Sequence, residues 1–265
     1  MMVKRLKLSS ENKHKLKQLN ENGVIISSYF TSKVDPQINS KPIEYQCRPN
    51  DLTYISSWLA TSLFYNLSPI LIVDDMQSEL INLLEQRGVI VVRADLGAMS
   101  TNDERFFCYA ELLNITNFKS ALFTDVSDVL IKKNPFNFFE MKKRICLGND
   151  METTPLVGNN AWMVEKTKAL LRSNEGLIES EDLTRFLRSK LVNAGVMGGP
   201  IIPIRKFIDD VVAFLAKCPA AGNWNMIAVN FVASKLDEDE YFQGAPFTSK
   251  FKKFNYEFDG YVVHK

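Results

Sequence analysis

The stretch "PILIVDDMQSELINLLEQRGVIVVRAD", residues 69–95, decides the expected fold. Its first and last parts are runs rich in Ile, Leu and Val, and the helical segment between them ends at Gly88. A strand, a helix and a second strand are therefore predicted in that order. Continuous apolar strands that alternate with helices are typical of a parallel sheet covered on both faces, which indicates an α/β fold.

The same alternation extends to both sides of this stretch. Further strands are expected at residues 24–30, 121–125 and 144–150, and helices at 51–65, 102–113, 181–191, 203–217 and 223–235. Asp51 is the expected N-cap of the first of these helices, and Asn102 or Asp103 that of the second. No linker rich in Gly, Ser or Pro divides the chain. A single Rossmann-like domain over residues 1–265 is predicted, with a mostly parallel sheet flanked by helices and a basic N-terminal extension at residues 1–22.

The composition limits the class of protein and its partners. Hydrophobic residues make up 46% of the chain, and 32 Lys and Arg balance 31 Asp and Glu, which argues against a nucleic-acid partner. Basic clusters at residues 1–17 and 250–253 are interpreted as solvated surface, with a weak peripheral membrane contact as the alternative. We expect a cytoplasmic protein without a transmembrane segment, because no apolar run reaches ~18 residues, no signal-peptide pattern is visible and the four cysteines are scattered.

Two acids follow the apolar run in "SALFTDVSDVLIKKNPF", residues 120–136. Asp125 ends the expected strand and Asp128 lies just past it. A buried carboxylate needs a partner, and three are considered: a metal ion, a phosphoacceptor role, or capping of the turn. The phosphoacceptor alternative lacks the later Lys-Pro of a receiver domain. Because the chain has only two histidines, His14 and His264, a metal would rest mainly on carboxylate oxygens, which favours Mg²⁺ or Mn²⁺.

Six stretches in the same order resemble motifs of GT-A-type nucleotide-sugar glycosyltransferases. "FTDVSDVLIKKNPF" is similar to the metal-binding Asp-x-Asp region, in the variant form Asp-x-x-Asp. "ISSYFTSKVDPQ" resembles the first-strand loop that holds the nucleotide, and "NDERFFCYAELL" resembles the helix whose arginine approaches the diphosphate. "NAGVMGG" looks like the segment lining the sugar pocket, "NWNMIAVN" like a helix near the reaction centre, and "VVHK" like the late histidine that binds metal. The similarity spans residues 24–265.

The resemblance implies an activity and a set of site residues. The activity is transfer of a sugar from a UDP- or GDP-type nucleotide-diphosphate sugar to a hydroxyl acceptor, a glycan or another molecule, with Mn²⁺ or Mg²⁺. The implied metal ligands are Asp125, Asp128 and His264, and the implied catalytic residues are Arg105, Asn193 and Asn225. Donor binding is implied for Ser28, Tyr29, Phe30, Thr31, Lys33, Asp125, Ala194 and Gly195.

Several of these residues also have a simpler structural interpretation. Tyr29 or Phe30 could stack on a base or pack in the core, and Arg105 could bind phosphate or form a surface ion pair with Glu104 or Glu111. The glycines of "NAGVMGG" either allow a sugar to approach the backbone or form a tight turn before Pro200.

Two features depart from the resemblance. Position 225 is Asn where the family more often has Asp, so it cannot act as a base. The Asp-x-x-Asp spacing leaves open whether both acids bind the metal or Asp128 alone. A catalytically inactive nucleotide-sugar or glycan-binding protein of the same fold is therefore the alternative. A nucleotidyltransferase is disfavoured, because no Gly-rich phosphate loop follows the first strand.

Overall fold

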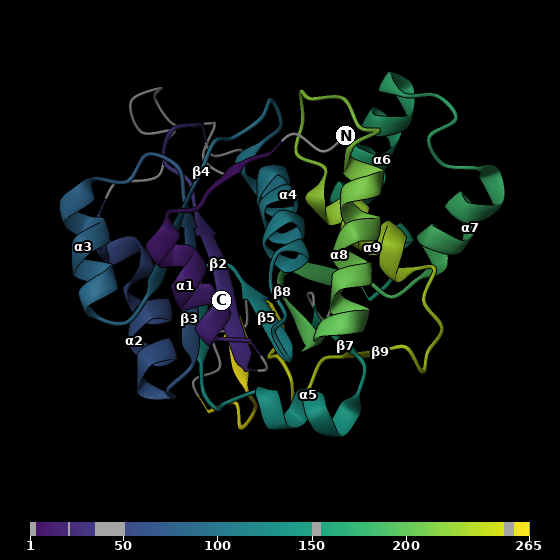
Figure 1. Cartoon of the computed structure of the whole chain (residues 1–265). Helices are drawn as coiled ribbons and strands as arrows, with labels where there is room; N and C mark the ends of the chain where they lie inside the picture. The colour runs from purple at the N-terminus through teal and green to yellow at the C-terminus, as the bar shows by residue number, and fades with distance from the viewer. Residues whose placement is uncertain (1–3, 21, 35–50, 150–154, 252–256, 265) are drawn as a thin grey trace.

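The computed structural model describes residues 4–20, 22–34, 51–149, 155–251 and 257–264. Eight strands of this part form one sheet in the order β1-β4-β3-β2-β5-β8-β7-β9 (Figure 1). Their bounds are β1 Leu6–Lys7, β2 Gly23–Tyr29, β3 Ser68–Val73, β4 Ile90–Ala94, β5 Ser120–Thr124, β7 Ile145–Asn149, β8 Val192–Pro200 and β9 Tyr241–Gln243. Strands β4, β3, β2 and β5 are parallel neighbours, whereas β8 runs antiparallel to both β5 and β7. The predicted α/β fold with a mostly parallel sheet is confirmed.

Helices cover both faces of the sheet. Their bounds are α1 Ser10–Gln18, α2 Ser56–Phe64, α3 Ser78–Gln86, α4 Thr101–Asn114, α5 Phe136–Lys142, α6 Ala161–Ser173, α7 Ser180–Arg188, α8 Ile201–Leu215 and α9 Asn225–Ala233. Side chains of α1, α4, α6, α7, α8 and α9 enter one apolar core, and those of α2, α3 and α5 enter a second. None of the described helices is long and apolar enough to cross a membrane.

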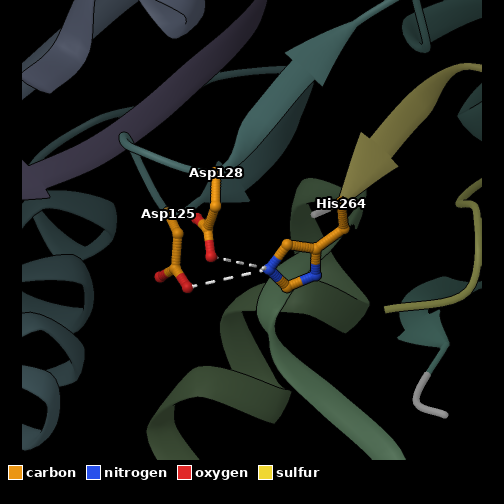
Figure 2. Close-up of side chains that lie close together, drawn as sticks. All are labelled: Asp125, Asp128 and His264. Carbon is orange, nitrogen blue, oxygen red and sulfur yellow. Dashed lines mark ion pairs between the residues drawn. The ribbon is translucent and has the colours of Figure 1, made fainter. Parts of the chain in front are cut away.

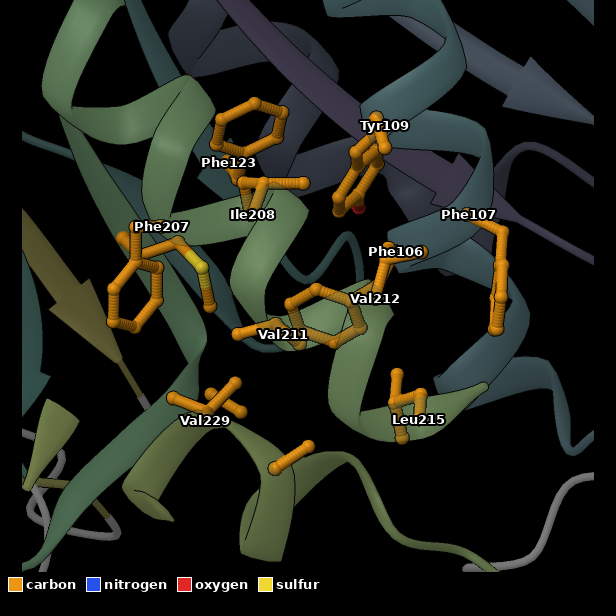
Figure 3. Close-up of a cluster of buried hydrophobic side chains, with 14 of the residues drawn as sticks. Phe106, Phe107, Tyr109, Phe123, Phe207, Ile208, Val211, Val212, Leu215 and Val229 are labelled. Carbon is orange, nitrogen blue, oxygen red and sulfur yellow. The ribbon is translucent and has the colours of Figure 1, made fainter. Parts of the chain in front are cut away.

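The pleat of β2 explains why there are two cores. Successive side chains of a strand point to opposite faces. Accordingly Val24 and Ile26 lie in the first core and Ile25 and Tyr29 in the second. Figure 3 shows part of the first core, where aromatic and aliphatic side chains of α4, α8 and α9 interlock. This packing fixes the position of α4, and α4 carries Arg105.

A second, two-stranded sheet brings the end of the described chain to the end of β5. β6 (Val129–Ile131) follows the two acids, and it pairs antiparallel with β10 (Val262–His264). In this register His264 lies opposite Val129, directly after Asp128. Residues separated by more than 130 positions in the sequence therefore meet at the carboxyl end of the parallel strands.

Two local predictions are corrected by the structure. Ser100, rather than Asn102 or Asp103, caps α4, because its hydroxyl accepts the Asp103 N–H. Asp51 caps the 3₁₀ turn Thr53–Ile55 that precedes α2, and so does not begin the helix itself.

The other corrections concern whole segments. The tight turn considered for the glycines before Pro200 is wrong, because residues 192–200 form β8 in the middle of the sheet. The described part of the basic N-terminal segment is more than solvated surface. β1 pairs with β4, Leu16 of α1 is buried, and the Asn12 side chain donates to Val91 O at 2.7 Å.

Candidate metal centre

Asp125, Asp128 and His264 converge just past the end of β5. One ligand atom from each lies within 4.8 Å of the others. Nε2 of His264 is 3.6 Å from Asp128 Oδ2 and 3.9 Å from Asp125 Oδ2 (Figure 2). The imidazole is 1% exposed, whereas the two carboxylates are 25% and 33% exposed. The group is therefore anchored on the protein side and open on the other, as a site that binds both a cation and a ligand requires.

Backbone contacts hold this group in place. The Asp125 N–H donates to Gly195 O at 2.7 Å, which continues the pairing of β5 with β8 by one residue. The His264 N–H donates to Ser249 Oγ at 3.0 Å, and the ring of Phe251 lies 4.7 Å from the imidazole, measured between centroids. The histidine ring is thus fixed by packing and by hydrogen bonds to its backbone.

The polar atoms of this group fit a bound cation. Within the described parts of the chain, Asp128 Oδ1 and both ring nitrogens of His264 are buried and have no hydrogen-bond partner. Buried polar atoms are seldom left without a partner, because the loss costs roughly 1–3 kcal/mol each. Two carboxylates and one imidazole are ligands of divalent cations, and an ion among them would satisfy several of these atoms.

Gly195 provides the space that the group occupies. A Cβ atom at this position would lie 2.5 Å from Asp125 Oδ2, 2.5 Å from His264 Cε1 and 2.8 Å from His264 Nε2. These distances are shorter than real Cβ contacts. Asp125 and His264 can therefore approach one another only because position 195 has no side chain.

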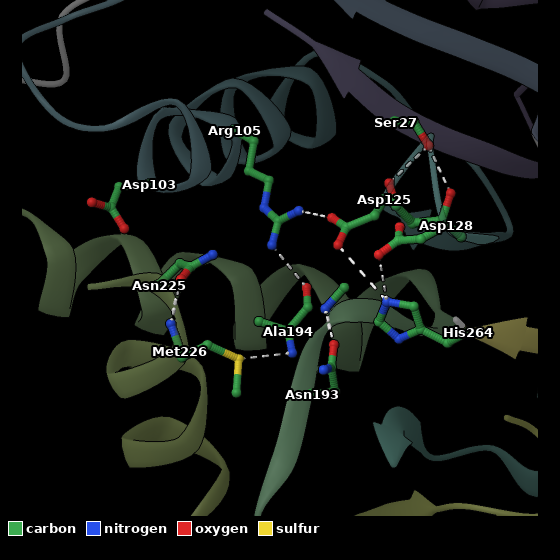
Figure 4. Close-up of polar contacts among 12 residues, drawn as sticks. Ser27, Asp103, Arg105, Asp125, Asp128, Asn193, Ala194, Asn225, Met226 and His264 are labelled. Atoms are coloured by element: carbon green, nitrogen blue, oxygen red, sulfur yellow. Dashed lines mark hydrogen bonds and ion pairs between the residues drawn. The ribbon is translucent and has the colours of Figure 1, made fainter. Parts of the chain in front are cut away.

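Arg105 connects α4 to this centre. Its Nη1 contacts Asp125 Oδ1, and its Nη2 donates to Ala194 O at 3.1 Å (Figure 4). The side chain is 8% exposed. The alternative of a surface ion pair is wrong, because Glu104 binds Arg5 and Glu111 accepts backbone N–H groups of Arg5 and Leu6. A buried guanidinium beside the acids is a ready partner for a phosphate group.

Two opposing effects set the charge of Asp128. Burial raises the pKa of its carboxyl group, but the contact with His264 and the positive charge of Arg105 outweigh burial, so the pKa lies below its ordinary value. The group is therefore ionised at neutral pH. Ionised carboxylates are the form that binds metal.

The two predicted catalytic asparagines lie near this centre and bind backbone groups. Asn193 Oδ1 accepts the Gly195 N–H at 2.7 Å, and Asn225 Oδ1 accepts the Met226 N–H at 2.6 Å. Met226 Sδ in turn accepts the Ala194 N–H at 3.4 Å. The start of α9 thus packs against the strand segment that contacts Arg105 (Figure 4).

The predicted donor loop follows β2 on the same edge of the sheet. Tyr29 and Phe30 are fully buried, so both rings pack in the core. The ring of Tyr29 stacks on that of Tyr54, with the ring centroids 5.3 Å apart. The Thr31 N–H donates to Asp74 Oδ1 at 2.8 Å, and Lys33 Nζ donates to the carbonyl oxygens of Gly97 and Met99. Ser28 is buried as well. Donor binding by these five residues stays a prediction.

The structure adds residues that sequence reasoning missed. Tyr109 lies one helical turn after Arg105. Burial raises the pKa of its hydroxyl to about 12, although the charge of Arg105 and the neighbouring Ser28 side chain act in the opposite direction. The i, i+4 spacing from Arg105 is a signal that could have found Tyr109. Ser249 carries no comparable signal, since its contact with His264 depends on the fold of the last segment.

Comparison with known proteins adds no family to this description. A scan against protein-family models finds no match, and a search of curated proteins finds none either. The findings are an α/β fold with a mixed sheet and an Asp-Asp-His group suited to a metal ion.

Proposed function

We propose that this protein is a metal-dependent glycosyltransferase that moves a sugar from a nucleotide-diphosphate sugar to a hydroxyl acceptor. The observation that carries the proposal is the convergence of Asp125, Asp128 and His264, with Arg105 against Asp125, at the carboxyl end of parallel strands. Ligands of open α/β sheets bind at this edge. The motif resemblance to GT-A-type transferases supports the same assignment.

The proposed roles follow from the chemistry of each side chain. Asp125, Asp128 and His264 hold Mn²⁺ or Mg²⁺, which as a Lewis acid supplies charge stabilisation to a leaving diphosphate. Arg105 offers a planar guanidinium that pairs with phosphate oxygens in two parallel hydrogen bonds. The open side of the group leaves room for these oxygens.

Asparagine side chains take the remaining roles in this proposal. An amide accepts and donates hydrogen bonds but does not take a proton at neutral pH. Asn193 and Asn225 therefore orient hydroxyl groups of the sugar or acceptor. Asn193 lies next to Ala194 in β8, and Asn225 is the first residue of α9.

The experiment is a turnover assay on a panel of UDP- and GDP-sugars. Release of the nucleoside diphosphate is measured with Mn²⁺, with Mg²⁺ and with excess EDTA. Release with at least one donor, lost in EDTA and restored by Mn²⁺, is the expected result. Release that continues unchanged in EDTA would contradict the proposal.

A second candidate function is binding of a nucleotide-sugar or glycan without turnover. It is favoured by Asn225, which cannot serve as a base, and by the absence of any other base among the residues of the described site. Calorimetry separates the two functions. Metal-dependent binding of UDP or GDP, with no release from any donor and any acceptor, would favour the binding protein.

A further inference from the structure

Three consecutive charged side chains are buried in the first turns of α4. Taken as whole residues, Asp103 and Glu104 are 0% exposed and Arg105 is 7% exposed. Charges are rarely buried unless each is paired or hydrogen-bonded. Glu104 binds the Arg5 guanidinium at 2.6 Å and the Met99 N–H at 3.0 Å, which fastens α4 to the N-terminal segment. Arg105 reaches the metal centre, so the role of Asp103 remains to be explained.

Asp103 binds the start of α9. Its Oδ1 accepts the Trp224 N–H at 2.9 Å, its Oδ2 accepts the Ser100 hydroxyl at 2.7 Å, and the Asn225 N–H also donates to this carboxylate. Trp224 is the N-cap residue of α9, and its own side chain makes no capping hydrogen bond. The first N–H groups of a helix need acceptors, and an acid there also interacts favourably with the helix dipole. Asp103 therefore caps α9 from another helix.

The helix start that Asp103 caps is the part of α9 that contacts the centre. Met226 lies against Ala194, whose carbonyl oxygen accepts from Arg105. One turn further, Asn230 binds both backbone groups of Val192, at 2.8 and 2.9 Å. Asp103 and Arg105, two residues apart on α4, thus hold α9 and β8 in one arrangement (Figure 4).

We infer that Asp103 is a positioning residue: it fixes the start of α9, and with it Asn225, beside Arg105 for the proposed transfer reaction. The part of this inference that concerns catalysis rests on the proposed function. Asp103 itself does not touch the substrate, because it is fully buried and its oxygens already accept hydrogen bonds. Its removal should leave the metal ligands in place and disturb the side of the site formed by α9.

The first test does not depend on turnover. Amide hydrogen exchange of Trp224 and Asn225 is measured by NMR in the wild type, in Asp103→Ala and in Glu104→Gln. Loss of a hydrogen bond to a charged group should speed exchange of these two amides by about tenfold or more in Asp103→Ala. Glu104→Gln is the matched control, because it neutralises a neighbouring buried carboxylate whose hydrogen bonds go to Arg5 and the Met99 N–H. In this variant the two amides should keep their wild-type rates.

The second test is kinetic. In Asp103→Ala, kcat should fall by about ten- to a hundredfold, because the residues at the start of α9 are no longer held in the reactive geometry. The donor KM and the Mn²⁺ concentration for half-maximal activity should stay unchanged. Glu104→Gln should keep kcat. Asp103→Asn retains one acceptor oxygen, and it should rescue part of kcat and exchange at rates between the wild type and Asp103→Ala.

The outcomes separate this inference from the proposed function. If the wild type releases no nucleotide from any donor, the proposed function fails, and the exchange rates alone decide whether Asp103 anchors α9. Wild-type exchange at Trp224 and Asn225 in the Asp103 variants overturns the inference. An unchanged kcat in a folded Asp103→Ala also overturns it. If Asp103→Ala does not fold, Asp103→Asn takes its place in the test. Wild-type exchange rates of the Trp224 and Asn225 amides in Asp103→Asn would then overturn the inference.

Discussion

Gly195→Ala tests whether the three ligands must meet as the structure shows. The new Cβ atom would lie 2.5 Å from both Asp125 Oδ2 and His264 Cε1, whereas ordinary contact begins at 3.4 Å, so each group must move by about 0.9 Å. Metal ligands hold their distances to within roughly 0.2 Å. The displacement is therefore several times larger than a metal site accepts, and at least one ligand should be lost.

The expected size follows from that loss. Mn²⁺ affinity should fall about ten- to a hundredfold or more, because disturbance of groups that merely support the ligands already costs that much. Gly195 does not have a positive φ, so an alanine backbone is not strained there. Isothermal titration calorimetry with Mn²⁺, together with thermal unfolding in EDTA, measures both effects.

A matched variant separates metal loss from general damage. At Gly158 a Cβ atom would lie 2.8 Å from Leu187 O, in a part of the fold that contains none of the three ligands. Gly158→Ala should lower the melting temperature and leave Mn²⁺ affinity unchanged. Wild-type Mn²⁺ affinity in Gly195→Ala would refute the reasoning, because the three side chains could then not be the ligands in this arrangement.

Three further predictions concern single side chains of the site. Asp128→Asn keeps the shape of the side chain and loses its charge, so it should retain the fold and lose most Mn²⁺-dependent turnover; activity equal to the wild type at low Mn²⁺ would remove Asp128 from the ligand set. Arg105→Lys should lower kcat/KM for the donor by about tenfold or more, because an ammonium cannot form the two parallel hydrogen bonds of a guanidinium; Arg188→Lys, on the exposed face of α7, is the control and should have no effect. The third prediction concerns pH. Burial raises the pKa of the Asp103 carboxyl group from 3.8 to about 6, although hydrogen bonds from Ser100, Trp224 and Asn225 and the charge of Arg105 act in the opposite direction. The folded state then binds more protons than the unfolded state between these values, so the unfolding free energy of the wild type should fall relative to that of Asp103→Asn by about 2 kcal/mol as pH rises from 4 to 7. Urea unfolding of both proteins in EDTA across this pH range measures the difference, and two parallel pH profiles would show that Asp103 does not titrate in this way.

The apolar runs predicted the parallel part of the sheet well. Strands buried on both faces are rich in apolar residues. β3 and β4 consist mostly of Ile, Leu and Val, whereas β2 and β5 combine apolar residues with Ser and Thr. β8 was harder to identify, because "NAGVMGG" has the composition of a loop. The structure gives a spatial reason for two of these glycines: Cβ atoms at Gly195 and Gly198 would clash with the acid–histidine group and with Phe139. Such a reason depends on neighbours that are distant in the sequence.

The candidate site was predictable where chemistry alone restricts the choice. Two acids after a buried strand need partners, and a chain with two histidines offers few alternatives for an imidazole ligand. The pairing of His264 with Val129 that brings the three residues together could not be derived from either segment alone. The link between Asp103 and α9 joins residues 121 positions apart, and no local pattern reports it.

The most direct test of the central claim is a crystal structure with Mn²⁺ and UDP or GDP, measured at the manganese absorption edge. An anomalous peak should lie within coordinating distance, roughly 2.0–2.3 Å, of Asp128, His264 and at least one oxygen of Asp125 or of the diphosphate. The guanidinium of Arg105 should then lie on the phosphate groups. The account would be contradicted if manganese bound elsewhere, or if the nucleotide occupied the structure with no metal among Asp125, Asp128 and His264.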